Sequence, residues 1–141
     1  MLQPLWLVPA FQELIAGVSE VPGPASNPRI DAYLATVGMQ SGDETAWCSA
    51  FVNWALDQAG IGGTGKPNAR SFLDWGDPCE PRVGAITVLW RGAPDGCQGH
   101  VAFLLGWSSA SVFLLGGNQG DAVSVASYNT QRVLGHRWPK G

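Results

Sequence analysis

The spacing of apolar residues changes near Arg82, and this change limits the fold more than any other feature of the chain. Before Arg82, apolar residues recur every three or four positions, which is the pattern of helices with one face on a core. After Arg82, short runs rich in β-branched and aromatic residues alternate with turn segments such as RGAPDGCQG, which is the pattern of strands. Helices followed by strands predict an α+β fold in which N-terminal helices pack on an antiparallel sheet.

Three helices and one shorter helix are predicted in the first half of the chain. Asn27 followed by Pro28 is a strong start signal, and Gly38 and Gly60 are stop signals. The predicted helices span residues 9–18, 28–38 and 44–60, with a brief helix within residues 66–76. The third helix is expected to lie across the sheet, because its apolar residues follow the spacing of a buried helix face.

About five strands are predicted after Arg82, at residues 84–90, 100–107, 112–118, 122–125 and 132–138. The second is nearly continuous in its apolar character, so we expect it in the middle of the sheet. The short SSAS connection predicts that residues 101–105 pair antiparallel with residues 112–115. The chain has 141 residues and no internal repeat, so a single domain over residues 1–141 is expected.

Composition and charge argue against several kinds of partner. Only 13% of the residues are charged and the formal net charge is −3, whereas a nucleic-acid-binding surface needs a basic stripe. The same charge opposes electrostatic adhesion to anionic lipid. The apolar N-terminus lacks a basic segment and is interrupted by Pro4 and Pro9, so we expect neither a signal peptide nor a membrane anchor.

Cys48 is the candidate nucleophile, because it falls in the first turn of the predicted helix over residues 44–60. The helix dipole and the free N–H groups of a first turn stabilise a thiolate, which predicts a lowered pKa for Cys48. Either Asp43 or Thr45 is expected to cap this helix. That choice decides whether the Cys48 amide is free to bind an oxyanion, and the sequence leaves it open.

A cysteine nucleophile needs a base, and the chain has two histidines. His100 opens a predicted core strand after a flexible turn, whereas His136 lies in the terminal GHRWP segment and is interpreted as a surface or packing residue. Asn118 ends the neighbouring strand, so its side-chain carbonyl is expected to accept the imidazole N–H of His100. Whether Asn118 or a neighbour is this third group stays open, since an Asn-Gln-Gly segment is most often a turn.

The two remaining cysteines offer two further interpretations. Cys79 and Cys97 would pair in an oxidising compartment, although buried reduced thiols are slightly favoured. Cys97 and His100 have the spacing of zinc ligands, but the chain has no paired Cys-x-x-Cys knuckle. We therefore expect no metal.

Several motifs together resemble one family: WCSAFVNW, GHVAFLLG, LLGGNQGD and RVLGHRWP. From Glu20 onward the chain looks like a member of the CHAP group of cysteine peptidases and amidases, in the NlpC-type papain-like superfamily, and more narrowly like a small phage and bacterial subfamily. The resemblance implies a papain-like fold, Cys48 as nucleophile, His100 as general base and Asn118 as the orienting residue. It also implies peptidoglycan as the substrate and no cofactor.

The resemblance leaves the bond and the biological setting open. The enzyme would be an N-acetylmuramoyl-L-alanine amidase or a stem-peptide endopeptidase. It would serve as a phage lysis enzyme or a virion component, made in the bacterial cytoplasm and acting in the periplasm or cell wall. The alternatives are an injected antibacterial effector, with an immunity protein as partner, and a wall-peptide-binding module without catalysis. We expect a monomer.

Overall fold

The computed structural model describes residues 4–21, 27–39 and 47–140. Within these ranges it contains three α-helices, two short 3₁₀ helices and six strands. The helices are α1 (Leu7–Ala16), α2 (Pro28–Ala35), α3 (Cys48–Gln58), η1 (Ala69–Asp74) and η2 (Thr130–Arg132). The strands are β1 (Asp77–Pro78), β2 (Ile86–Trp90), β3 (Gly99–Trp107), β4 (Ser111–Gly116), β5 (Ser124–Asn129) and β6 (Val133–Trp138). The predicted α+β class and antiparallel sheet are confirmed.

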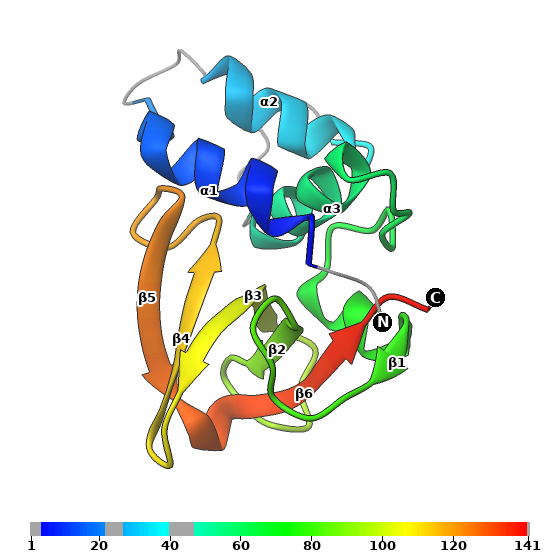
Figure 1. Ribbon diagram of the computed structural model, residues 1–141, viewed down its shortest axis with the longest axis vertical. Helices are drawn as coiled ribbons and strands as arrows, with labels where there is room; N and C mark the ends of the chain where they lie inside the picture. Colours follow the sequence, from blue (N-terminus) through cyan, green and yellow to red (C-terminus); the bar gives the residue numbers. More distant parts are fainter. Residues whose placement is uncertain (1–3, 22–26, 40–46, 141) are drawn as a thin grey trace.

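The strands form one sheet in the order β1-β6-β2-β3-β4-β5, and every neighbouring pair is antiparallel. Strands β2 to β5 follow one another as a meander, and β6 returns to pair with the free edge of β2 (Figure 1). The predicted pairing of the second and third strands is confirmed, since Phe103 lies opposite Leu115 and Leu104 opposite Leu114. Strand β3 therefore lies inside the sheet, as its apolar sequence predicts.

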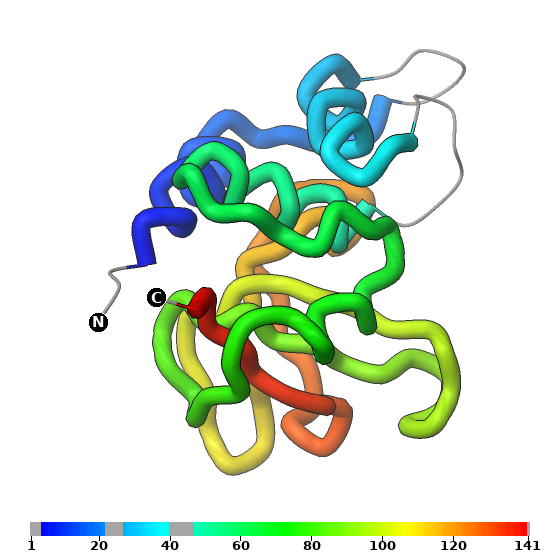
Figure 2. Tube along the Cα trace, turned by 90° about the vertical axis from the view of Figure 1, so that its right-hand side faces the viewer, coloured from blue at the N-terminus to red at the C-terminus, as the bar shows by residue number. Residues whose placement is uncertain are grey.

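The three α-helices lie together on one side of the sheet, as Figures 1 and 2 show in two perpendicular views. Helix α3 contacts α2 on one side and β3 on the other, so it is the middle layer. Phe51 and Leu56 of α3 are completely buried, and the Phe51 ring meets Phe103 of β3 edge-on at 6.3 Å between centroids. Burial of these large side chains fixes α3 across the centre of the sheet.

A buried polar cluster joins α1 to α2. The Asn27 side chain accepts the Arg29 N–H at 2.9 Å, and Pro28 follows it as the first helical residue, as predicted. Arg29 then donates to the Glu13 carboxylate, and the Tyr33 hydroxyl donates to the same carboxylate at 2.7 Å. Glu13 is only 2% exposed, so this buried charge is compensated by a cation and a hydroxyl.

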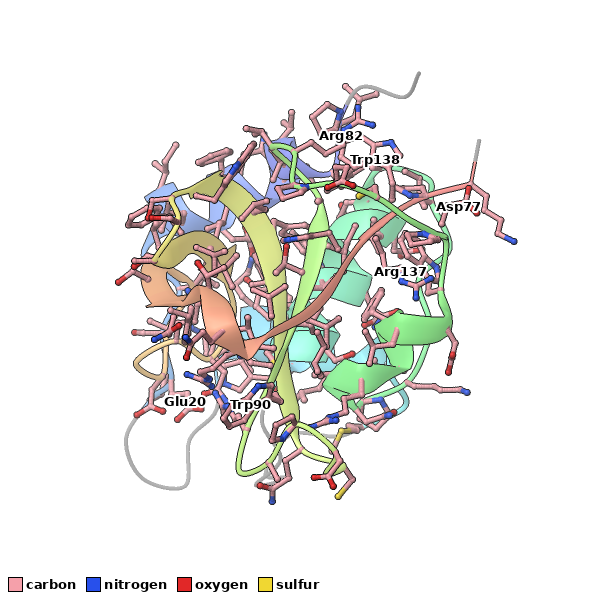
Figure 3. The ribbon with its side chains drawn as sticks, turned by 90° about the horizontal axis from the view of Figure 1, so that it is seen from below. Glu20, Asp77, Arg82, Trp90, Arg137 and Trp138 are labelled. Carbon is pink, nitrogen blue, oxygen red and sulfur yellow. The ribbon has the colours of Figure 1, made fainter. Side chains whose placement is uncertain are left out.

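The far end of the sheet is closed by aromatic packing at β6. Trp138 is buried against Trp6, with 5.0 Å between ring centroids. The guanidinium of Arg82 lies 3.5 Å from the Trp138 ring, and Figure 3 shows these two side chains next to each other. This cation–π contact covers the C-terminal end of β6, where β1 pairs with it.

Element boundaries differ from the predictions where local signals are weak. Helix α1 begins at Leu7, and Pro9 fits in its first turn because no intrahelical hydrogen bond is needed there. Helix α3 begins at Cys48, with Trp47 at the N-cap position and no capping hydrogen bond from its side chain. The predicted capping residues Asp43 and Thr45 lie outside the described residues. The two-residue strand β1 was not predicted.

Candidate active site

Cys48 is the first residue of α3, and only 2% of its surface is exposed. Burial raises the pKa of its thiol, because an ionised sulfur loses its hydration there. The backbone N–H of Val101 and the guanidinium of Arg91 lower this pKa, as do the N–H groups of the first helical turn, but by less. The prediction of a lowered pKa is therefore wrong for this structure, because desolvation outweighs the helix N-terminus.

His100 is completely buried near the start of β3, and its ring has a defined hydrogen bond on one side only. Its Nε2 lies 2.9 Å from the side-chain oxygen of Gln119, while its Nδ1 has no partner among the described residues. An amide oxygen only accepts, so Nε2 carries the proton and donates it. The neutral ring therefore leaves Nδ1 as an unoccupied acceptor.

Gln119 is held in one orientation by the sheet. Its side-chain nitrogen donates to the backbone carbonyl oxygens of Leu114, at 3.2 Å, and Ser124, at 2.7 Å. Since these carbonyl oxygens only accept, the amide nitrogen must face them and the amide oxygen must face His100. Gln119 thereby selects the ring tautomer in which Nδ1 is free to take up a proton.

Asn118 does not bind His100, so the prediction that its side chain accepts the imidazole N–H is wrong. The backbone of Asn118 is left-handed, with φ 57°, which asparagine tolerates better than most residues. The next residue, Gln119, is buried and takes the place beside His100. The sequence left open that a neighbour of Asn118 binds His100, but it did not single out Gln119, because the adjacent amides look equivalent. The turn character of Asn-Gln-Gly was the available signal that Asn118 itself is a turn residue.

The cysteine and histidine occupy adjoining places where α3 packs on β3. The Val101 N–H, one residue after His100, acts directly on the Cys48 sulfur. The Cys48 sulfur also acts electrostatically on Tyr128, whose hydroxyl lies 3.4 Å from His100 Nε2. The Tyr128 ring, from β5, packs against the imidazole at 5.3 Å between centroids. No sequence signal pointed to Tyr128.

The electrostatic surroundings keep the imidazole neutral. Burial lowers the pKa of His100 to about 4, against its hydrogen bond to the Gln119 oxygen, which raises it. The guanidiniums of Arg91 and Arg132 lower the His100 pKa further. At neutral pH the His100 ring is therefore an unprotonated base and Cys48 is a protonated thiol.

A pocket of about 340 Å³ opens onto Cys48. It is lined by Cys48, Pro67, Asn68, Ala69, Arg91, Cys97, Gln98 and Gly99. A second pocket of about 460 Å³ adjoins it through Asn68, which lines both. The second pocket is lined by Thr64, Lys66, Asn68, Arg70, Ser71, Asp74 and Trp75. Together they extend from the thiol along residues 64–75.

The other histidine and cysteines lie in different surroundings. His136 is half-buried on β6, where its Nδ1 lies 2.9 Å from the Thr87 hydroxyl, which fits its predicted packing role. Cys79 and Cys97 are both free thiols in this structure. Cys97 is exposed and Cys79 is only partly buried, so the expectation of buried thiols is wrong for Cys97 and holds only in part for Cys79.

Two further searches concern metals and membranes. The described residues hold no group of three or more histidine, cysteine or acidic side chains arranged to bind a metal ion. No helix within residues 4–21, 27–39 and 47–140 has the length and apolar character needed to cross a membrane.

The chain was also compared with known proteins. No protein-family model matches this sequence, and no curated protein matches it significantly.

Proposed function

We propose that this protein is a papain-like cysteine hydrolase of amide bonds, with Cys48 as nucleophile, His100 as general base and Gln119 as the residue that orients His100. One observation carries the proposal: Gln119 fixes the His100 tautomer and leaves its buried Nδ1 without a partner among the described residues, on the strand whose next residue, Val101, acts on the buried Cys48 thiol. Buried polar atoms in folded proteins are nearly always hydrogen-bonded. An unsatisfied acceptor in the same region of the core as a thiol is suited to receiving that thiol's proton.

The chemistry follows from this arrangement. The Cys48 thiol gives its proton to His100 Nδ1, and the sulfur attacks the carbonyl carbon of the amide. The Cys48 N–H has no intrahelical partner, being at the start of α3, and donates to the oxyanion. His100 Nδ1–H then protonates the leaving amine as the C–N bond breaks. Water, deprotonated by His100, hydrolyses the thioester and restores the thiol.

Peptidoglycan is the proposed substrate, on the strength of the motif resemblance to CHAP-type enzymes. The two adjoining pockets support it, since they give an extended substrate room beyond the scissile bond. Cleavage at the glycan–peptide amide and cleavage within the stem peptide share this chemistry. The phage lysis, virion and injected-effector settings share it as well.

The test is incubation of the purified protein with purified sacculi, followed by mass spectrometry of the released muropeptides. Wild type should release products, and Cys48→Ala and His100→Gln should release at least about a thousandfold less. Cys79→Ser is the matched control, because Cys79 lies outside the pocket. Equal release by wild type and Cys48→Ala, or no release by either, would refute the proposal. The product masses identify the bond.

A wall-peptide-binding module is the second candidate, and the neutral, buried pair of Cys48 and His100 favours it. The two functions differ in thiol reactivity. A catalytic Cys48 reacts with a neutral alkylating reagent in a pH profile that changes when His100 is replaced by Gln. Tight muropeptide binding together with a pH profile that His100→Gln leaves unchanged would favour the module.

A further inference from the structure

Arg91 is the charged side chain of the pocket that opens onto Cys48. The other seven described residues lining this pocket carry no formal charge in their ordinary states. Arg91 directly follows Trp90, the last residue of β2, which Figure 3 labels. Within the described part of the chain, its guanidinium has neither an ion pair nor a side-chain hydrogen bond, so its N–H donors remain available to a ligand.

The wall that carries Arg91 is held in place by another arginine. The Arg70 guanidinium donates to the backbone carbonyl oxygens of Gln98, Ala93 and Pro94, at 2.8, 2.9 and 3.0 Å respectively. The backbone N–H of Arg91 donates to the Gln98 carbonyl oxygen at 3.1 Å and closes the same loop. Arg70 is therefore occupied by the protein itself, whereas Arg91 is presented on a fixed backbone.

The field of Arg91 reaches the reacting groups. Its positive charge acts on the Cys48 sulfur, on the His100 ring and on the Tyr128 hydroxyl. A negative group that binds Arg91 would therefore lie close to the nucleophile. Carboxylates are the anions whose two oxygens match the planar donor fork of a guanidinium.

We infer that Arg91 is a specificity-determining residue that binds a carboxylate of the substrate beside the scissile amide. The inference rests on the proposed role of Cys48 as nucleophile. It extends that role by naming the chemical class of the neighbouring substrate group: an acidic side chain or a free carboxyl terminus, in preference to its carboxamide.

The test compares two alkylating reagents that differ only in this group. Iodoacetate carries a carboxylate and iodoacetamide a carboxamide, and each forms an S–C bond with the Cys48 thiolate while iodide leaves. Peptide mapping measures the rate at Cys48 for each reagent. Because both reactions need the same thiolate, the ratio of the two rates is independent of the Cys48 pKa. In wild type this ratio should exceed that of N-acetylcysteine in the same buffer.

Arg91→Gln should lower the ratio by about tenfold, because the anionic reagent loses its charged hydrogen-bond partner. Arg91→Lys should give an intermediate ratio, since the charge stays and the fork is lost. Lys140→Gln is the matched control: it removes the same charge from an exposed residue outside the pocket and should leave the ratio unchanged. An unchanged ratio in Arg91→Gln, or an equal fall in Lys140→Gln, would overturn the inference.

A measurement on wild type keeps the inference testable if the Arg91 variants fold poorly. Succinate should protect Cys48 from iodoacetamide at concentrations at which succinamide does not, and equal protection would count against the inference. The alkylation ratio and sacculus cleavage are separate readouts. Cleavage without a raised ratio overturns the role of Arg91 alone, whereas a raised ratio without cleavage supports carboxylate binding at Arg91 and refutes the hydrolase.

Discussion

Two buried polar clusters in this protein have opposite characters. Between α1 and α2, the Glu13 carboxylate is matched by Arg29 and Tyr33, so the buried charge has a cation and a hydroxyl as partners. Between β3 and the turn after β4, His100 is matched by Gln119 on one nitrogen and by no described residue on the other. Burial and hydrogen bonding are common to both. The atom without a partner distinguishes the candidate site at His100 from the purely structural cluster at Glu13.

The largest expected effect concerns Gln119, the residue that leaves His100 Nδ1 free. Gln119→Leu removes the acceptor of the His100 Nε2–H, so the ring populates both tautomers and Nδ1 is often protonated. We expect kcat on peptidoglycan to fall by about 10²–10³, or about 3–4 kcal/mol of barrier, while KM changes little. Nitrogen-15 chemical shifts of the His100 ring should change from one tautomer to a mixture.

Asn118→Gly is the control for this comparison. It keeps the left-handed backbone of the turn and removes a side chain that does not bind His100. Its activity should stay close to that of wild type. A fall as large as that of Gln119→Leu would show that the turn, and not the amide of Gln119, sets the activity.

The second effect is a dependence of stability on pH that arises from His100. Its pKa is about 4 in the folded protein and near 6.5 when unfolded. Between these values the unfolded chain binds more protons, so stability falls as the pH is lowered from 6.5 to 4. The groups that act on the ring are Gln119, Arg91 and Arg132. The loss should be about 3 kcal/mol in the free energy of unfolding.

Urea unfolding at pH 7 and pH 4, for wild type and His100→Gln, measures this contribution. The difference in unfolding free energy between wild type and His100→Gln should change by about 3 kcal/mol between pH 7 and pH 4. His136 provides the comparison, because burial also lowers its pKa. His136→Gln should therefore reduce the pH dependence in the same direction. A pH dependence that survives unchanged in His100→Gln would contradict the assigned burial.

The smallest expected effect concerns the cluster of Glu13, Arg29 and Tyr33, in which the buried carboxylate has hydrogen-bond partners. Glu13→Gln removes the charge that pairs with Arg29, whose side chain is 55% exposed and can turn to water. The cost should therefore be about 2 kcal/mol of stability, less than for a fully buried pair. Thermal unfolding checks the loss, and the alkylation rate of Cys48 should not change. A changed alkylation rate would mean that the cluster between α1 and α2 also affects the surroundings of Cys48.

Much of the fold could be predicted because its signals are local. Asn27 and Pro28 define the start of α2, and the apolar character of residues 100–107 predicts an interior strand. The strand β1 could not be predicted, because two residues carry no periodicity and pair only where β6 passes.

The site was predicted in part for the same reason. Cys48 and His100 stand out by residue type and by position at the ends of their elements. Gln119 depends on the backbone angle of Asn118, and a neighbouring pair of amides does not reveal that angle. The raised pKa of Cys48 depends on how closely α3 packs on β3, which is a property of the assembled core.

The contact between Arg70 and the pocket wall has a consequence for how such a protein can change. Among the residues that the structure describes, the Arg70 guanidinium binds only main-chain carbonyl oxygens of the loop, and every amino acid supplies that atom. Substitution of exposed side chains, such as those of Asp95, Cys97 and Gln98, therefore leaves the backbone hydrogen bonds that position Arg91 intact. The rim of the pocket can vary while its shape is kept, so under the proposed function substrate preference can change independently of catalysis.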